Sequence, residues 1–429
     1  MNKLTSISIF RVAFVFTMLA IFVGCNTNKI IPQETNYQYD NKINDLNPKY
    51  LVYHTNDSLS YLYLEIATKE LLYVRESSKM PFESEVKFSF QIYEDYKGKV
   101  LIDSDSKVFY DYKTEVRNKR ILARIPLAIN YGSNAIIKII AYDVNKKIQS
   151  ESVLEINKSD NYSEQFFLLK QKLTGNVCFN SYISSVDSLT VESDYNRDED
   201  FMVDFFNTNY PASIPPFSRN RVVEIPQNRD SLFLLSIENK LGGITLDKQG
   251  SYFIRSIDSS NYCLTLQKLD SNFNSFYNYM GMIGPLKYIC TSGEYTALST
   301  AENKREAVER FWLRVGGSKE RARVVIEEYY RRVELANKFF TSYKEGWKTD
   351  RGMLSIVMGL PKTIYKTNNG ETWIYGTPNN MMMSLTFNFN KENTDKNNND
   401  YQLVRYRTYR DYWYRACESW RQGRIYNYN

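Results

Sequence analysis

The 429-residue sequence predicts a mainly β N-terminal half, built of β-sandwich-like domains, followed by an α+β C-terminal module with two helices, a small antiparallel sheet and a last helix. Three observations predict this fold class. Up to about residue 290, apolar and polar residues alternate in short segments typical of half-buried strands. The apolar period changes to about 3.6 residues near residue 299. Short strand-like segments return after residue 352.

The N-terminus has the pattern of a secretory signal. Lys3 and Arg11 precede an apolar run over residues 12–23, which is too short to span a bilayer comfortably. The run ends in Gly24-Cys25, which resembles the lipobox of bacterial lipoproteins. In that family the thiol receives diacylglycerol, the chain is cut before the cysteine, and the new amine is acylated. The resemblance implies a signal peptide over 1–24 and a lipidated Cys25 as a permanent membrane anchor. The alternative is a cleaved signal followed by an incidental free cysteine.

Residues 25–48 comprise this cysteine and a stretch rich in Asn, Gln, Lys and Pro, which predicts a flexible tether. Residues 26–29 contain no acidic cluster. Lipoproteins of Bacteroidota that are sent to the cell surface often carry such a cluster. We therefore expect an outer-membrane, lipid-anchored protein that faces the periplasm, with exposure on the cell surface as the alternative.

Residues 49–157 predict a β-sandwich-like domain. Polar and apolar residues alternate over 61–66 and 86–93, and a β-branched segment covers 135–144. Turn residues such as those at 97–99 separate these segments, and short strands with such turns favour an antiparallel sandwich. Residues 158–298 predict a second, less regular β-rich domain.

Residues 299–429 predict the helical and α+β module. Ser299 and Glu302 have the Ser-x-x-Glu spacing of a capping box, which indicates the start of a helix. Gly316-Gly317 is expected to end that helix, and Ser318 is expected to cap a longer one. The segments expected next are a strand over 353–358, strands over 371–375, 382–388 and 402–408, and a last helix over about 409–420.

The module contains a turn, Gly346-Trp347-Lys348-Thr349-Asp350-Arg351-Gly352, that we expect to be sharp. Its carboxylate and hydroxyl can bond nearby backbone N–H groups, and its Asp can pair the Arg or cap a strand end. The interpretations left open are a fold-fixing turn and a ligand site. The candidate binding or fold-fixing residues are Gly346, Trp347, Thr349, Asp350, Arg351, Gly352, Gly359, Pro361, Trp373, Tyr375 and Arg421.

These residues, in this order, resemble the GWxTD-domain lipoprotein family of Bacteroidota. The likeness rests on residues 327–337, 346–352, 359–361 and 372–375, with supporting matches at Phe311-Trp312 and at 420–423. It covers roughly residues 285–425. The resemblance implies a module of this family and names no activity.

The search for reaction chemistry finds few groups. The chain has one histidine, His54, which we expect at the surface or a sheet edge, so a serine or cysteine triad would depend on it alone. Cys178, Cys263, Cys290 and Cys417 lack metal-ligand spacing; a disulfide and free thiols both remain open. We therefore expect no metal and no cofactor. The net charge of +6 is mild, which argues against nucleic acid.

The function we expect is that of a non-enzymatic envelope protein, attached to the membrane by its lipid, that binds other outer-membrane or periplasmic proteins through its tyrosine-rich β domains and the module. One alternative is a glycan-active or peptidase-like enzyme, with Asp350 and Glu371 facing one open cleft beside Trp347 and Arg351. A second alternative is a peptidoglycan- or glycan-binding module with Trp347 and Trp373 as exposed platforms. The sequence leaves the oligomeric state open.

Overall fold

The computed structural model describes Tyr39 and residues 46–116, 119–184, 188–207, 209–218, 228–259, 261–270, 273, 279–361, 363–376, 384–391 and 399–428. The chain divides into two compact units, residues 1–33 and 34–429, and the described residues belong to the second. The predicted signal peptide, Cys25 and most of the predicted tether lie outside the described residues. In the part of the chain that the structure describes, no helix is long and apolar enough to cross a membrane.

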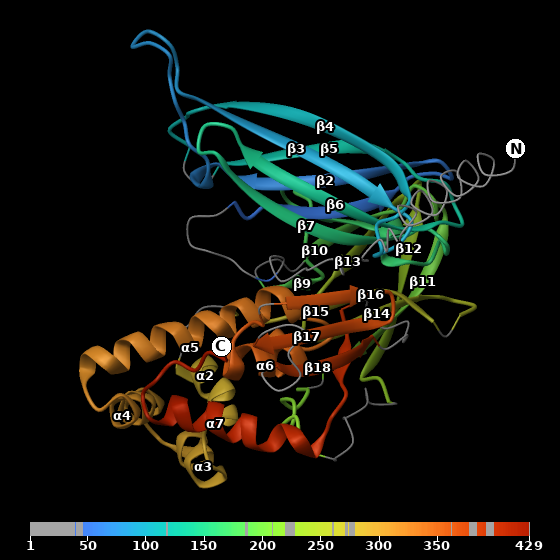
Figure 1. Cartoon of the computed structure of the whole chain (residues 1–429). Helices are drawn as coiled ribbons and strands as arrows, with labels where there is room; N and C mark the ends of the chain where they lie inside the picture. Colours follow the sequence, from blue (N-terminus) through green and yellow to red (C-terminus); the bar gives the residue numbers. More distant parts are fainter. Residues whose placement is uncertain are drawn as a thin grey trace, which may run out of the picture. The chain divides into compact units, whose positions relative to one another are not determined.

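The expected fold class is confirmed, with strands in the first half and helices beside a small antiparallel sheet in the second (Figure 1). The first seven strands form two antiparallel sheets, ordered β1-β2-β5 and β4-β3-β6-β7. Buried residues of both sheets, such as Leu62 and Phe88, share one core, as in a sandwich. The strands are β1 Lys49–His54, β2 Leu59–Ala67, β3 Glu83–Tyr93, β4 Leu101–Tyr112, β5 Arg120–Ala128, β6 Asn134–Asp143 and β7 Ile148–Asn157, with a 3₁₀ turn η2 at Thr68–Glu70.

The next eight strands form a single sheet, ordered β8-β10-β13-β12-β11-β14-β15-β9. It is antiparallel except for the pair of β15 and β9. Phe206 and Phe253 from this sheet pack with Tyr210 and Tyr343, so aromatic contacts join the sheet to the C-terminal module. The elements are η3 Glu164–Phe166, β8 Leu168–Gln171, β9 Tyr182–Ile183, β10 Ser188–Glu192, β11 Glu199–Phe206, β12 Ser231–Glu238, β13 Leu241–Thr245, β14 Gly250–Ser256 and β15 Tyr262–Lys268.

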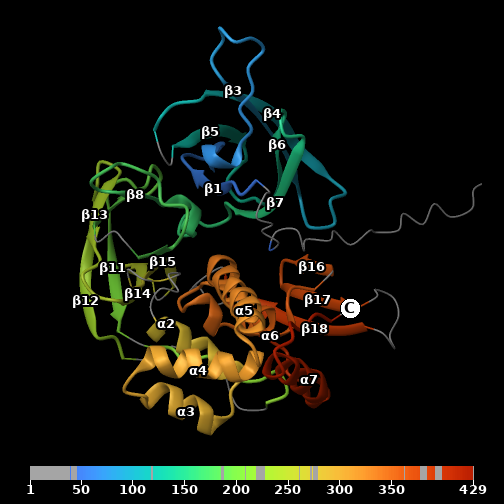
Figure 2. The ribbon, with the colours of Figure 1, turned by 90° about the vertical axis from the view of Figure 1, so that its left-hand side faces the viewer.

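The C-terminal module packs its helices and the sheet β16-β17-β18-β19 around one apolar core. Figure 2 shows α5 and α6 beside strands of this sheet. The two helices expected from the 3.6-residue period are α4 and α5, the expected last helix is α7, and the structure adds α2, α3 and α6. The elements are α2 Tyr279–Ile283, η4 Gly284–Tyr288, α3 Ser292–Thr300, α4 Lys304–Gly316, α5 Lys319–Phe340, η5 Gly346–Lys348, α6 Asp350–Met358, β16 Thr363–Thr367, β17 Gly370–Gly376, β18 Ser384–Lys391, β19 Tyr401–Leu403, η6 Arg407–Tyr409 and α7 Arg410–Arg421.

The predicted end of α4 and the predicted start of α5 are confirmed, but the helix start predicted at Ser299 is wrong. Gly317 takes a φ of 70° directly after α4, and the Ser318 hydroxyl accepts from the backbone at the start of α5. The capping box lies at Thr291 and Glu294, where it opens α3. Ser299 instead sits in the last turn of α3, where its hydroxyl donates to the carbonyl of Tyr295. The Ser-x-x-Glu spacing alone therefore misplaced the helix start.

The strand expected over residues 353–358 is also wrong, because these residues belong to α6. Every residue of α6 is buried, so the segment shows neither the two-residue nor the 3.6-residue alternation of a half-buried element. A short, fully apolar run does not distinguish a buried strand from a buried helix. The N-cap formed by Thr349 starts the helix in this segment.

Candidate functional site

The Gly346–Gly352 segment lies against the end of α5. The Thr341 hydroxyl accepts from the Gly346 N–H at 3.0 Å, and the Asn337 side-chain carbonyl accepts from the Trp347 N–H at 3.0 Å. A Cβ on Gly346 would stand 2.0 Å from the carbonyl oxygen of Ala336. Glycine is required here because the backbone of the turn touches the backbone of α5.

Thr349 turns the chain into α6. Its hydroxyl accepts from the Gly352 N–H at 3.0 Å and donates to the Gly346 carbonyl at 2.7 Å. The threonine is thus the N-cap of α6. A Cβ on Gly352 would stand 1.9 Å from the Gly346 carbonyl oxygen, so glycine is also required at this second position because the two backbone segments lie so close.

Trp347 is half-buried and packs on the segment that precedes α3. The edge of its ring would lie 3.0 Å from a Cβ on Gly284, and its ring centroid is 6.2 Å from that of Tyr288. The Tyr288 hydroxyl donates to the Trp347 carbonyl at 2.7 Å. The tryptophan therefore attaches the turn to η4.

Asp350 does not pair with the neighbouring Arg351. Its carboxylate forms an ion pair with Arg405 and accepts from the Leu403 N–H at 2.8 Å. It thereby caps the end of β19, one of the two roles expected from the sequence. Only 5% of Asp350 is exposed.

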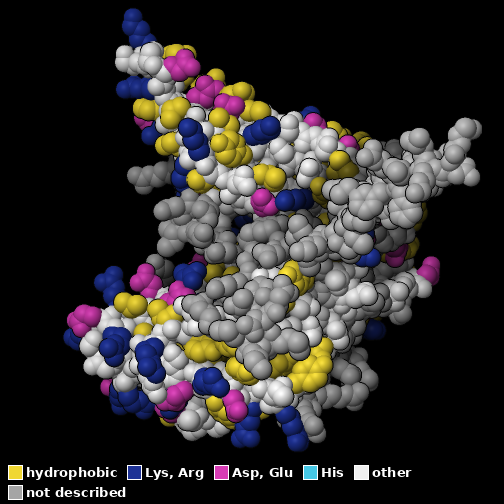
Figure 3. Space-filling model, viewed as in Figure 1, with side chains coloured by type: hydrophobic (Ala, Val, Ile, Leu, Met, Phe, Trp, Pro, Cys, Tyr) yellow, Lys and Arg dark blue, Asp and Glu magenta, His cyan; other side chains and the backbone are white. Residues whose placement is uncertain are grey.

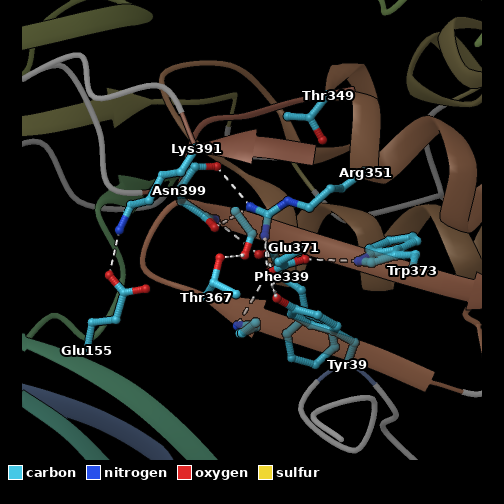
Figure 4. Close-up of polar contacts among 12 residues, drawn as sticks. Tyr39, Glu155, Phe339, Thr349, Arg351, Thr367, Glu371, Trp373, Lys391 and Asn399 are labelled. Atoms are coloured by element: carbon cyan, nitrogen blue, oxygen red, sulfur yellow. Dashed lines mark hydrogen bonds and ion pairs between the residues drawn. The ribbon is translucent and has the colours of Figure 1, made fainter. Parts of the chain in front are cut away.

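Arg351 is the centre of a buried polar cluster (Figure 4). Its guanidinium lies 3.1 Å from the Glu371 carboxylate and donates to the backbone carbonyl of Asn399 at 2.9 Å. It stacks over the Tyr401 ring, with 3.9 Å to the ring centroid. Arg351 is 2% exposed, so almost all of its charge is met by protein groups.

Glu371 is surrounded by donors. The Tyr39 hydroxyl donates to it at 2.6 Å, the Trp373 indole at 2.9 Å, and Lys366 lies 3.4 Å away. Burial alone would raise the pKa of Glu371, but the charges of Arg351 and Lys366 and these two hydrogen bonds hold it below its ordinary value. Glu371 is therefore a carboxylate that the fold keeps ionised.

Tyr39 corrects the prediction of a flexible tether over residues 25–48. It is 5% exposed and packs among Phe339, Phe340 and Trp373 in the core of the module. Tyr39, within the predicted tether, is thus bound to the GWxTD-like region. No local pattern around Tyr39 indicated this contact.

The second predicted turn and the strand after it are also internal. Gly359 has a φ of 82°, and a Cβ there would meet the Arg332 guanidinium at 3.1 Å. The Tyr375 hydroxyl donates to the Gly359 carbonyl at 2.8 Å. Trp373 is fully buried, and Pro361, two residues after Gly359, is buried as well.

Arg421 joins the last helix to α3. It forms an ion pair with Glu294 at 2.6 Å and donates to the Ile289 carbonyl at 3.1 Å. The hydrogen bond from Arg421 lowers the pKa of Glu294 to about 2. Each residue in the predicted set other than Pro361 therefore makes an identifiable contact within the module.

The two alternative functions made geometric demands that the structure does not meet. Asp350 and Glu371 were expected to face one open cleft, yet each is sealed in its own ion pair, with exposed fractions of 5% and 2%. Trp373 was expected as an exposed platform, and its exposed fraction is 0%. These particular side chains therefore do not form the acid–base pair or the aromatic platform that the alternatives required.

The remaining reactive side chains are buried or half-buried. His54 lies at the end of β1, the edge strand of its sheet, which agrees with the sheet-edge position expected for it, but its side chain is buried and not at the surface. Its ring contacts Ser60 Oγ at 2.8 Å and the Asn157 carbonyl at 3.1 Å. Burial, followed by the charge of Lys158, lowers the pKa of His54 to about 4. The four cysteines within the described ranges are free thiols, and no cluster suited to a metal occurs among the residues described.

A cavity of about 140 Å³ lies on the outer side of Asp350. Residues 210–214 form one of its walls, and residues 400–402 with Arg405 form another. The lining also includes Asp350, Lys287, Tyr343 and Lys344. The Ser213 N–H donates to the Lys348 carbonyl at 3.0 Å, which holds the first wall against the turn. Sequence reasoning missed the cavity because its walls lie far apart in the chain.

Comparisons with known proteins address the C-terminal part of the chain. Residues 250–422 match the family model of the GWxTD domain, which confirms the resemblance. Among curated proteins, none matches the chain. Among solved structures, the chain is similar to a transglutaminase of red sea bream, at 7% identity and a TM-score of 0.18, over 53% of this chain and 32% of that one. The chain thus spans about a third of that protein's length, and a TM-score this low carries no argument.

Proposed function

We propose that this chain, whose residues 250–422 carry a GWxTD domain, is a non-enzymatic, lipid-anchored protein that acts as a binding or scaffolding component at the outer membrane. Acylated Cys25 is the anchor, and the folded part faces the periplasm and binds other envelope proteins. Support for the anchor comes from the charged start, the short apolar run and the Gly24-Cys25 ending of the N-terminus.

The observation that carries the binding role is the open edge of the sandwich at β4. Among the described strands, β4 pairs only with β3 and ends its sheet. It is 12 residues long, and every one of its residues is at least partly exposed. Ile102, Val108 and Tyr110 are 49%, 41% and 59% exposed. Such an edge offers free backbone groups and apolar side chains to an added strand.

The partner that fits this edge is a protein that contributes an extended segment. Figure 3 shows hydrophobic side chains among charged ones over the part of the surface where Figure 1 places β3 and β4. Asp103 and Asp105 lie in the middle of β4, while Lys107 follows them. A segment with apolar residues at every second position and a basic residue opposite the aspartates complements this strand.

The experiment is affinity purification of the tagged full-length protein from gently solubilised outer membranes after mild crosslinking. The test variant is Ile102→Glu with Tyr110→Glu, and the matched control is Val324→Glu on α5, which is 56% exposed. Both variants should remain folded, because substitutions at exposed positions usually change stability by less than about 0.5 kcal/mol. We expect the β4 variant to lose a specific envelope partner that the wild type and the Val324→Glu control both retain.

A partner set that survives the β4 variant, or that is lost equally in the Val324 control, would contradict docking at β4. Fractionation of a Cys25→Ser variant tests the anchor separately. We expect that variant to leave the membrane fraction, and its retention there would contradict lipid anchoring. Recovery of a second tagged copy of this chain as the β4-dependent partner would replace the proposed heterologous partner with self-association.

A further inference from the structure

The outward face of η6 and the last helix α7 carries arginine and tyrosine side chains. Arg407, Arg410 and Arg415 are exposed, and Tyr406 and Tyr414 are each 51% exposed. We call these five residues the α7 face. The opposite side of α7 packs into the apolar core of the module, so the helix is held in place without them. Neither the fold nor docking at β4 gives the α7 face a role.

The arginines of the α7 face keep their charges exposed to solvent. Among the described residues none of the three forms an ion pair, whereas the exposed arginines of α4 pair with glutamates of α3 and α4. Arg410 lies 5.7 Å from the ring centroid of Tyr414, and Arg415 lies 5.5 Å from that of Tyr412. Such a ring supports the arginine and leaves the guanidinium edge available to an anionic group.

The charge around the α7 face is positive. The three arginines and Arg424 give four positive charges, and Asp411 and Glu418 give two negative ones, so the sum is +2. Figure 3 shows Lys and Arg side chains beside hydrophobic ones along the lower edge, where Figure 1 places α7. Arginine binds phosphate groups, and tyrosine is enriched where a bilayer meets water. This combination suits the headgroups of anionic phospholipids.

The length of chain before Tyr39 keeps the module near the bilayer. Cys25, the proposed lipid anchor, precedes Tyr39 by 14 positions. A fully extended chain of this length spans at most about 50 Å. Tyr39 is bound in the core of the module that carries α7. An anchored chain therefore holds the α7 face at high local concentration relative to the membrane surface.

We propose that the α7 face is a second membrane contact, which lies against anionic phospholipid headgroups. The arginines bind lipid phosphates, and Tyr406 and Tyr414 lie at the level of the headgroups. The proposal rests on the lipid anchor of the proposed function and deepens it, because the acyl chains hold the protein at the membrane while the α7 face sets how the module meets it. A lipid chain combined with a basic patch is a known form of stable attachment.

The test measures sedimentation of the protein with lipid vesicles. The chain begins at Asn26, so it lacks the predicted signal peptide and Cys25 but keeps the whole compact unit 34–429. Circular dichroism checks its folding. We expect it to bind vesicles of phosphatidylcholine with phosphatidylglycerol far more tightly than vesicles of phosphatidylcholine alone. Binding should weaken as the salt concentration rises, because ions screen exposed charges.

Two variants examine the two kinds of side chain. Arg407→Gln, Arg410→Gln and Arg415→Gln in one chain should lower the affinity for anionic vesicles about 100-fold, since each basic side chain near such a surface contributes about fivefold. Tyr406→Ser with Tyr414→Ser should weaken binding by the same factor at low and high salt, because salt does not screen the contact of the rings with the headgroups.

The matched control is Arg75→Gln, Lys79→Gln and Lys97→Gln, which removes three positive charges from exposed positions of the sandwich. We expect this control to bind like the wild type. No binding by the wild type, equal binding to neutral vesicles, or an equal loss in the control overturns the proposal. An envelope protein that requires the α7 arginines, without vesicle binding, overturns the membrane as the occupant. Fractionation of Cys25→Ser tests the anchor independently, so a failed anchor and a failed α7 face give different results.

Discussion

The ion pair of Arg351 and Glu371 should be a major determinant of the stability of the GWxTD domain. Replacing Glu371 by Gln leaves the Arg351 charge in an interior where it is 2% exposed. Breaking a buried pair at one partner costs about 3–5 kcal/mol, because the remaining charge is uncompensated. Most domains are stable by only about 5–15 kcal/mol, so this single change removes a large share.

The two partners should not respond equally. In Arg351→Met, Glu371 still has Lys366 at 3.4 Å together with the donors Tyr39 and Trp373, so its charge remains partly compensated. We therefore expect about 3 kcal/mol for Arg351→Met, mostly from the lost contacts with Asn399 and Tyr401. The double variant should cost about 2 kcal/mol less than the sum of the single variants, since it leaves neither the Arg351 charge nor the Glu371 charge buried without its partner.

The measurement is urea unfolding followed by tryptophan fluorescence. All five tryptophans lie between residues 312 and 420, so this signal reports on the GWxTD domain and not on the β-sandwich. The midpoint should move while the slope stays constant if the folded state alone is affected. Single effects below about 1 kcal/mol, or a double variant that is additive within about 0.5 kcal/mol, would refute the argument.

Two further predictions concern backbone packing and pH. Gly346→Ala should destabilise the domain by about 3 kcal/mol in the same fluorescence assay, because its Cβ would stand 2.0 Å from the Ala336 oxygen. The control is Gly293→Ala, where a Cβ has open space, and this change should be neutral or stabilising. For His54, the folded-state pKa of about 4 lies below the ordinary 6.5, so the unfolded chain binds the proton first and stability should fall as the pH drops from 6.5 to 4. The full loss of unfolding free energy over this pH range is about 3 kcal/mol. When urea midpoints from circular dichroism are plotted against pH, the curve should be flatter for His54→Gln than for the wild type. An identical curve in both proteins would contradict this reasoning.

Local patterns in the sequence predicted the elements whose two faces differ. Alternation located β2 and β3, and the 3.6-residue period located α4 and α5, because each of these elements has one buried face. The period gave no answer for α6, which is buried on all sides. The family likeness selected the correct turn residues without giving their partners.

Those partners come from distant parts of the chain, which is why the sequence could not supply them. Tyr39 reaches Glu371 across 332 positions, and Arg405 contacts the carbonyl of Ile214 across 191 positions. The packing of whole helices and strands determines such pairs, and neither the composition nor the spacing of residues in the sequence indicates how those elements pack. The cavity was missed for the same reason, since Tyr210 and Arg405 meet only in the folded chain.

The contacts of Asp350 show how the turn fixes groups that lie far from it in the sequence. Thr349 and the two close-packed glycines fix the start of α6, and this places the Asp350 carboxylate at the end of β19. The carboxylate then takes both terminal nitrogens of Arg405, a residue that lines the cavity. Disturbing the turn would therefore move Arg405 as well as weaken the fold. A loss of binding in an Asp350 variant could therefore not by itself be assigned to direct contact with a ligand or partner, because the same change disturbs Arg405 and the start of α6.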